Sequence, residues 1–168
     1  MPRSGDRLAP LEVRDTLGGR EFTVRGRCTV NAAGPWLDRV AKLAVPQAPQ
    51  VIRTSKGVHL LVRRSPDGPL GSPDAASVIS DSKTKRILFV VPWKMDTMLV
   101  GTTDTDYTGD LDNVRADRAY VDYIRENFTN YYPRGIEVKD ILTTQAGLRP
   151  LIFSSGKDER TTSREHRI

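Results

Sequence analysis

Residues 86–107, RILFVVPWKMDTMLVGTTDTDY, constrain the fold of this chain more than any other stretch. Ile87–Val91 is apolar at every position, and Thr97–Val100 is similar but shorter. Trp93-Lys94-Met95-Asp96 lies between them, so the pattern predicts a β-hairpin. Apolar residues at successive positions are typical of a strand with both faces buried, which places the hairpin in the middle of a covered sheet. Pro92 has no N–H for the ladder and is predicted to end the first strand.

The second strand of this hairpin runs into Gly101–Asp106, where small hydroxyl and carboxylate side chains replace apolar ones. A buried strand that ends in such a cluster tends to deliver polar groups to the edge of a cavity. Asp104 and Asp106 have a spacing that a divalent cation could use. Because no histidine or further carboxylate follows at ligand spacing, we expect turn chemistry with bonds to nearby backbone N–H groups, and no metal site.

Composition limits the classes of function. The chain has 168 residues, of which 38% are hydrophobic and 28% charged, as in ordinary soluble globular proteins with one core or slightly more. It has no apolar run that could span a bilayer and no signal-peptide pattern. The net charge of +5 favours anionic partners, but basic residues are scattered and not interleaved with aromatics. This favours a small anionic substrate, a phosphate-bearing cofactor or an anionic membrane surface over nucleic acid.

The first third of the chain predicts a hairpin followed by a strand, a turn and a helix. Leu11–Asp15 and Arg20–Val24 alternate apolar with polar residues on either side of a Gly-Gly turn. Cys28–Ala33 reads as a short strand of small residues, and the lone Cys28 as a core residue of a cytosolic protein. Gly34-Pro35-Trp36 then begins a helix whose free N–H groups could approach a flat ligand or its phosphates. By spacing alone, a plain strand-to-helix turn is the commoner alternative.

The remainder predicts further strands and one amphipathic helix. Val58–Arg63 alternates as a strand, with His59 on the face opposite Val58, where a packing role is commoner than catalysis. A short strand is predicted at Ala76–Ile79, and a helix follows Asp117 with apolar residues at four-residue steps. Another strand begins near Val138 and continues toward Arg149, an arginine among apolar residues. Such a charge needs an anion, either a structural carboxylate, which is the default, or a substrate.

Six motifs occur in the order and approximate spacing of one known family. They are NAAGPW at 31–36, KGVH at 56–59, FVVPW at 89–93, GTTDTDY at 101–107, AGLRPL at 146–151 and SREH at 163–166. From about Leu11 to its end, the chain resembles the FAD-dependent glycerol-3-phosphate dehydrogenases. The resemblance implies oxidation of sn-glycerol 3-phosphate to dihydroxyacetone phosphate, with hydride transfer to FAD and electrons passing on to membrane quinone.

The resemblance also implies the fold and its organisation. We expect an α+β chain with an antiparallel substrate-binding sheet, flanking helices and a partial FAD-binding α/β domain of the glycerol-3-phosphate dehydrogenase and D-amino-acid oxidase superfamily type. Residues 1–45 would belong to the FAD-binding domain, 46–152 to the substrate-binding sheet, and 153–168 would return toward the FAD domain. The protein would be cytoplasmic, at the inner face of the membrane.

Site residues follow from the same motifs. The family's K-G-x-H histidine, beside flavin and substrate, matches His59, which is therefore the candidate catalytic residue. Arg149 matches an arginine expected to be both catalytic and substrate-binding. The resemblance adds further substrate-binding and cofactor-binding positions. That for substrate is Arg164, and those for FAD are Ala33, Gly34 and Trp36. Lys56 is expected to bind substrate by adding to the positive field that Arg149 and Arg164 create around the phosphate.

Two family features are missing from this sequence. It has no G-x-G-x-x-G dinucleotide fingerprint and no glycine-rich, lysine-bearing stretch after SREH. The chain is therefore predicted to be the middle and substrate-binding part of a longer enzyme, with weak or absent flavin binding on its own. The alternatives are a related FAD-dependent amine or amino-acid oxidase, and an inactive fragment or anion-binding module.

Overall fold

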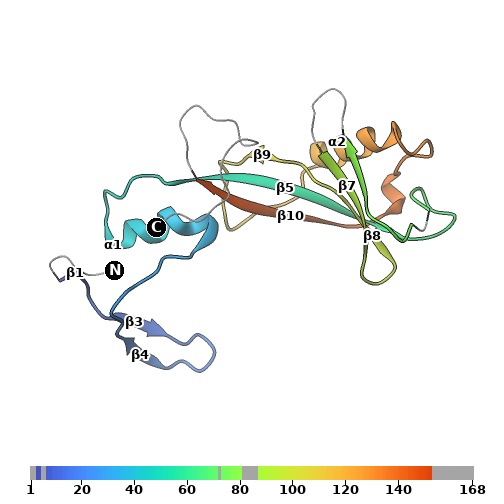
Figure 1. The fold of residues 1–168 in the computed structure, drawn as a ribbon. Helices are drawn as coiled ribbons and strands as arrows, with labels where there is room; N and C mark the ends of the chain where they lie inside the picture. The colour runs from blue at the N-terminus through green and yellow to red at the C-terminus, as the bar shows by residue number, and fades with distance from the viewer. Residues whose placement is uncertain (1–2, 5–6, 72, 81–86, 153–168) are drawn as a thin grey trace. The chain divides into compact units, whose positions relative to one another are not determined.

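The computed structural model of the chain describes residues 3–4, 7–71, 73–80 and 87–152 (Figure 1). The chain divides into two compact units, Met1–Ile52 and Arg53–Ile168. None of the helices in the described ranges is long and apolar enough to cross a membrane. The two units are considered separately below.

The first unit contains two small hairpins and one helix. Strands β1 (Arg3–Ser4) and β2 (Arg7–Leu8) pair with each other, as do β3 (Leu11–Arg14) and β4 (Glu21–Val24), and both pairs are antiparallel. The pairing of β3 with β4 confirms the hairpin predicted for Leu11–Asp15 and Arg20–Val24. A 3₁₀ turn, η1 (Gly34–Trp36), leads directly into helix α1 (Leu37–Ala44), which confirms the predicted turn and helix.

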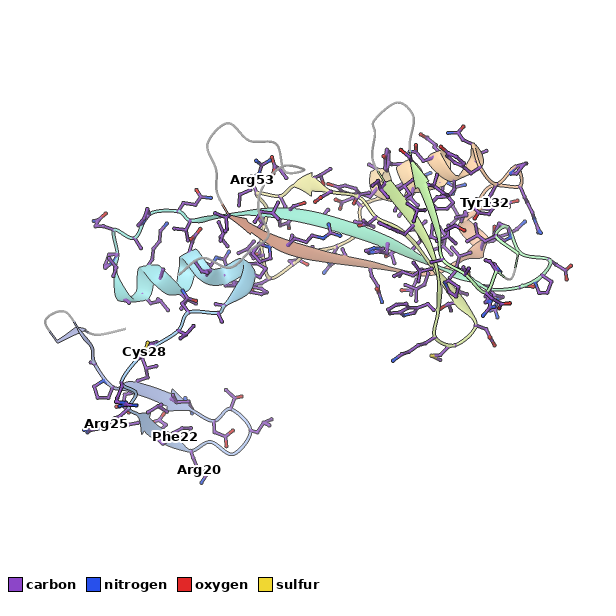
Figure 2. The ribbon with its side chains drawn as sticks, in the orientation of Figure 1. Arg20, Phe22, Arg25, Cys28, Arg53 and Tyr132 are labelled. Atoms are coloured by element: carbon purple, nitrogen blue, oxygen red, sulfur yellow. The ribbon has the colours of Figure 1, made fainter. Side chains whose placement is uncertain are left out.

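The predicted strand at Cys28–Ala33 is wrong. The segment is irregular, and no described strand pairs with it. The Asn31 side chain shapes a local turn instead, donating to the Leu37 carbonyl at 2.9 Å and accepting from the Ala33 N–H at 3.2 Å. Cys28 is exposed, so its prediction as a core residue is also wrong (Figure 2). A short run of small residues becomes a strand only where a partner supplies the ladder.

The second unit is an antiparallel sheet with one long helix. The order of its main strands is β10-β5-β8-β7-β6, and β9 pairs with the other end of β5. Their bounds are β5 Ile52–Arg63, β6 Ser77–Ser80, β7 Ile87–Trp93, β8 Thr97–Gly101, β9 Thr105–Asp106 and β10 Ile141–Ile152. Helix α2 (Arg118–Thr129) and the 3₁₀ turn η2 (Val138–Asp140) precede β10. This α+β architecture confirms the predicted fold class, and the short strand and the helix after Asp117 are confirmed with it.

The central hairpin is confirmed, with one correction. Strands β7 and β8 are interior, and Met95 and Asp96 turn between them with φ values of 57° and 52°. Pro92 does not end β7, because the strand continues to Trp93 with Pro92 opposite Met98. Pro92 lies beyond the end of β6, so its missing N–H interrupts no pairing on that side.

The sheet has one covered face and one face that is largely uncovered in the described chain. The covered face, called the helix face below, packs against Ile124 and Phe128 of α2. Its buried strand residues include Val58, Leu60, Val62, Ile79, Leu88, Val90, Met98 and Val100. Their neighbours point to the opposite face, called the open face below, where Ile87 is 51% exposed and Phe89 39%. The expectation that both faces of this hairpin are covered is therefore wrong for the described residues.

Candidate active site

Strand β5 carries two chemically distinct sets of side chains on its two faces. Alternation along the strand places Ser55, Gly57 and His59 on the open face and Lys56 on the helix face. His59 lies opposite Gly101 of β8. A Cβ atom at Gly101 would lie 3.2 Å from the His59 Cδ2 atom and 2.7 Å from the Val58 carbonyl oxygen, so the absence of a side chain there leaves room for the imidazole.

A pocket of about 240 Å³ on the open face brings together the two residues predicted to be catalytic. His59 comes from β5, and Arg149 comes from the neighbouring strand β10. Other lining residues are small or uncharged. They are Gly57, Gln145, Ala146, Gly147 and Leu148.

His59 is suited to accept a proton. Burial lowers the pKa of its imidazole below the ordinary value of 6.5, and the positive charge of Arg149 lowers this pKa further. The ring is therefore neutral at neutral pH, with a lone pair available on one nitrogen. Among the described residues, neither ring nitrogen has a hydrogen-bond partner.

Arg149 is held by weak contacts and keeps donors to spare. Its Nη1 lies 3.4 Å from both the Thr103 carbonyl oxygen and Asp104 Oδ1, and its Nη2 lies 3.3 Å from Thr102 Oγ1. The side chain is 33% exposed. A guanidinium has five N–H donors, so three long contacts leave it able to bind another anion. The structural carboxylate considered from the sequence is present as Asp104, but it does not saturate Arg149.

The Gly101–Asp106 cluster does not behave as the local turn that the sequence predicted. Asp104 accepts a hydrogen bond from the Ser55 hydroxyl, and the Thr103 hydroxyl accepts from the Val58 N–H at 3.0 Å. Asp106 accepts from Arg53 at 2.6 and 2.7 Å. These bonds tie the segment to β5 across the sheet, so the expectation of bonds to nearby N–H groups is wrong. No group of three or more metal-ligand side chains occurs in the part of the chain that the structure describes.

Lys56 is not brought into the pocket. Its ammonium lies on the helix face, where it donates to Asp117 Oδ2 at 2.6 Å and to the Arg115 carbonyl oxygen at 3.0 Å. It also lies 4.3 Å from the centre of the Tyr120 ring. The side chain is 4% exposed, which is the environment of a structural ion pair.

The residues predicted to contact FAD all lie in the first unit. Gly34 has a φ of +53° in the left-handed region, and a Cβ atom there would have no neighbour within 4 Å. Ala33 accepts from the Trp36 N–H at 3.1 Å, and Trp36 is 37% exposed. This is a tight turn with an open backbone at Gly34, which suits close approach of a flat ligand. Arg164, the remaining predicted substrate contact, lies outside the described residues.

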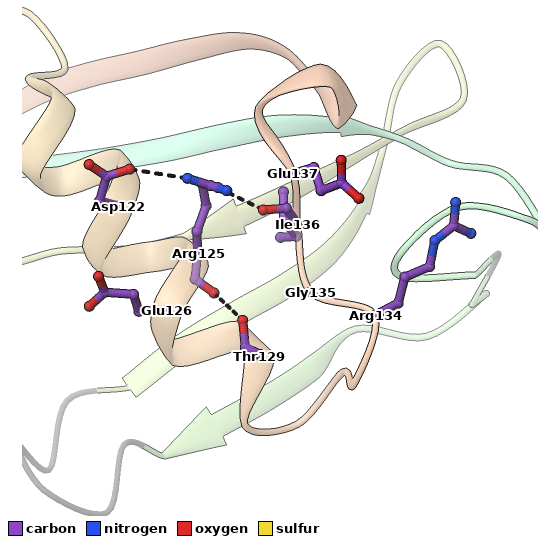
Figure 3. A pocket seen from close by; sticks show the side chains of 8 residues that line it. All are labelled: Asp122, Arg125, Glu126, Thr129, Arg134, Gly135, Ile136 and Glu137. Atoms are coloured by element: carbon purple, nitrogen blue, oxygen red, sulfur yellow. Dashed lines mark hydrogen bonds and ion pairs between the residues drawn. The ribbon is translucent and has the colours of Figure 1, made fainter.

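A second pocket, of about 210 Å³, lies between α2 and the segment that follows it (Figure 3). Arg125 crosses it, donating to the Ile136 carbonyl oxygen at 2.7 Å and to Asp122 Oδ1 at 3.1 Å. The other charged side chains that line this pocket are Glu126, Arg134 and Glu137. Because Arg125 is already engaged by the protein, this pocket is a weaker candidate than the one beside His59.

Two contributors to the first pocket were missed from the sequence. Ser55 binds Asp104, and Gly57 lies directly beneath Arg149, where a Cβ atom would be 2.7 Å from Nη1. A usable signal existed, because Ser55, Gly57 and His59 are spaced by two residues and so share one face of a strand.

An α+β chain with a histidine and an arginine lining one pocket on a face of an antiparallel sheet can offer a small ligand a proton acceptor and an anion-binding group. Residues 6–163 match the family of FAD dependent oxidoreductases. The chain belongs to this family.

Individual relatives are similar over most or all of the chain. Glycerol-3-phosphate dehydrogenase 2 of Mycobacterium bovis is 36% identical over 166 residues, which cover 99% of this chain and 27% of the relative. D-erythritol 1-phosphate dehydrogenase of Brucella abortus is 33% identical, over 88% of this chain and 28% of the relative. The chain thus spans little more than a quarter of these relatives.

One solved structure supports the same relationship. The glycerol-3-phosphate dehydrogenase of Bacillus halodurans, determined in complex with FAD, superposes with a TM-score of 0.76 at 29% identity, covering 90% of this chain and 30% of that one. The resemblance to the glycerol-3-phosphate dehydrogenases that the motifs predicted is confirmed.

Proposed function

We propose that this chain is the substrate-binding part of a flavoenzyme that oxidises sn-glycerol 3-phosphate to dihydroxyacetone phosphate. The observation that carries the proposal is the pocket shared by His59 and Arg149. Relatives named for glycerol 3-phosphate and erythritol 1-phosphate, both phosphorylated polyols, support the substrate class. Because the chain covers 27% of the first of these, the activity belongs to a protein of the relatives' length that contains this segment.

Oxidation of a secondary alcohol removes a hydride from carbon and a proton from the hydroxyl. FAD, when bound, supplies the hydride acceptor. His59 accepts the hydroxyl proton, since its lowered pKa keeps the imidazole neutral. Replacing His59 with Gln should lower turnover roughly 10²- to 10⁴-fold, the usual effect of removing a general base, with a smaller effect on substrate affinity. Unchanged turnover would assign His59 to packing.

Arg149 binds the phosphate of the substrate. A phosphate removed from water needs charge-assisted donors in fixed geometry, and guanidinium offers a planar pair of donors. Arg164 is proposed to complete this phosphate site. Ala33, Gly34 and Trp36 would hold the flavin, because the backbone at Gly34 is open to close approach.

Arg149→Lys separates phosphate binding from a purely structural role. In the full-length enzyme it should raise KM for glycerol 3-phosphate roughly 10- to 100-fold through loss of a bidentate contact, while leaving weak activity on unphosphorylated glycerol unchanged. Arg63→Lys, at an exposed arginine of the neighbouring strand β5, is the matched control. If Arg149 serves only as the ion-pair partner of Asp104, both substrates should suffer equally and the melting temperature should fall.

The remaining partners follow from the same proposal. Electrons would pass from FAD to quinone, with the enzyme cytoplasmic and bound at the inner face of an anionic membrane. Turnover with a soluble quinone analogue and no oxygen tests the acceptor, and sedimentation with anionic vesicles tests the membrane contact. A substrate panel that includes amino acids would expose an amine or amino-acid oxidase. A visible spectrum of the purified 168-residue chain should show no stoichiometric flavin.

A further inference from the structure

Gly57 is the residue on which the Arg149 side chain rests. A Cβ atom at Gly57 would lie 2.7 Å from Nη1, 2.9 Å from Nη2 and 3.0 Å from Cζ of Arg149. All three are guanidinium atoms, and real Cβ atoms essentially never come as close to another heavy atom as the Nη1 and Nη2 distances would require. The guanidinium therefore occupies the space where any other residue would place its side chain.

The backbone itself does not require glycine at this position. The φ angles of Gly34, Gly71 and Gly101 are positive, whereas that of Gly57 is not. Gly57 lies within the regular strand β5, where glycine is less favourable than residues with a side chain. The close contact with Arg149 thus accounts for glycine at this position better than local conformation does.

Asp104 holds the guanidinium from a second direction. Its carboxylate contacts Arg149 Nη1 at 3.4 Å and is itself fixed by the Ser55 hydroxyl. Ser55 and Gly57 are two residues apart and lie on the same face of β5. One short stretch of strand therefore both holds Asp104, through Ser55, and leaves room for the Arg149 guanidinium, at Gly57. Thr102 adds a contact to Nη2 at 3.3 Å.

We propose that Gly57 is a positioning residue, which keeps open the space that holds the Arg149 guanidinium beside His59 while Asp104 anchors it there. The significance of this arrangement rests on the proposed function, because it would align the phosphate-binding arginine with the proton acceptor. A side chain at Gly57 would displace Arg149 and leave the strand intact, since the clashing atoms are the end of a flexible side chain.

The test measures the position of Arg149 through His59, without substrate or flavin. The chain has two histidines, and comparison with His59→Gln identifies the His59 resonance in an NMR titration. The positive charge of Arg149 disfavours protonation of His59, so moving this charge away should raise the pH midpoint of the His59 titration. Gly57→Ala should therefore raise it, as should Arg149→Leu. In the double variant Gly57→Ala/Arg149→Leu, the midpoint should equal that of Arg149→Leu alone, because both substitutions act through the same charge.

Gly147→Ala is the matched control. Gly147 lines the same pocket, but a Cβ atom there would meet nothing within 4 Å, so the His59 midpoint should stay at the wild-type value. An unchanged midpoint in folded Gly57→Ala would overturn the proposal, as would an unchanged midpoint in Arg149→Leu. If Gly57→Ala alone failed to fold, recovery of the fold in the double variant would support the guanidinium as the obstacle, and no recovery would overturn it.

Failure of this proposal can be told apart from failure of the proposed function. The titration needs no turnover, so absence of glycerol 3-phosphate oxidation by the full-length enzyme would leave its result standing. Conversely, phosphate-dependent turnover with an unchanged midpoint in Gly57→Ala would remove only the role assigned to Gly57.

Discussion

Loss of the Asp117 carboxylate should destabilise this protein more than loss of the lysine it binds. The Lys56 side chain is 4% exposed and that of Asp117 is 63% exposed. In Asp117→Ala the buried ammonium keeps, among the described residues, the Arg115 carbonyl oxygen and the rings of Tyr107 and Tyr120 as partners, but no anion. In Lys56→Met the solvated carboxylate remains in water and the apolar stem of the side chain is largely replaced.

The structure sets the size of this asymmetry. Breaking a buried ion pair by removing one partner costs about 3–5 kcal/mol, and the exposure of Asp117 reduces this to about 2–3 kcal/mol. Loss of helix capping adds little, because the Asp117 side chain makes no capping hydrogen bond to α2. Lys56→Met should cost about 1 kcal/mol, in the range of volume-conserving core substitutions. The double variant should be close to Lys56→Met, since no unpaired cation remains.

Urea and thermal unfolding followed by circular dichroism measure these differences. For a chain of this length, 2–3 kcal/mol corresponds to a melting temperature lower by about 4–12 °C. Glu126→Ala, which removes an exposed carboxylate from the same helix, is the control and should change stability by less than about 0.5 kcal/mol. Equal stability of Asp117→Ala and Lys56→Met, or a greater loss in Lys56→Met, would refute this account of the ion pair.

Three further outcomes are expected. Because the pKa of His59 is lowered in the folded state from 6.5, the unfolded state binds more protons just below that pH. Stability should therefore fall as pH decreases from about 6.5 to the native pKa, and His59→Gln should remove this component of the unfolding curve. Gly101→Ala should cost about 2–4 kcal/mol in denaturant unfolding, since φ is +143° and its Cβ would meet the Val58 carbonyl oxygen, whereas Gly147→Ala should stay within about 0.5 kcal/mol of wild type. Lys56→Met should change KM for glycerol 3-phosphate in the full-length enzyme no more than Asp117→Ala does, because both substitutions act only through the same ion pair. A larger rise in KM in Lys56→Met would return Lys56 to the substrate site.

The sequence was informative where local pattern determines structure. The hairpin around Trp93–Asp96 and helix α2 follow from apolar periodicity, which reports on single elements. The strand proposed at Cys28–Ala33 failed, because a strand depends on a partner that its own residues do not specify. The prediction that Ile87 and Phe89 are buried was wrong for a related reason. An apolar run cannot reveal what covers each face of a sheet.

The candidate site was predictable to a similar degree. An arginine among apolar residues implied a need for an anion, and the structure supplies the structural carboxylate of that prediction as Asp104. Whether Asp104 would saturate Arg149 depends on distances of 3.3–3.4 Å that no pattern encodes. Lys56 shows the opposite limit. Its positive charge suggested substrate binding, and only the fold reveals that the charge is paired with Asp117 at 2.6 Å.

Adjacent positions of β5 therefore serve different purposes. The pleat of a strand sends Lys56 toward α2 and leaves Gly57 facing Arg149, although the two residues are neighbours in sequence. Lys56 joins the strand to the start of the helix through Asp117, and this fixes the backbone on which the guanidinium rests. A charge on the helix face can thus support the site without facing it, because a rigid strand carries the constraint from one face to the other. On this argument Asp117→Ala should loosen Arg149 as well as lower stability, and the His59 titration midpoint would rise in that variant although Asp117 lies on the other side of the sheet.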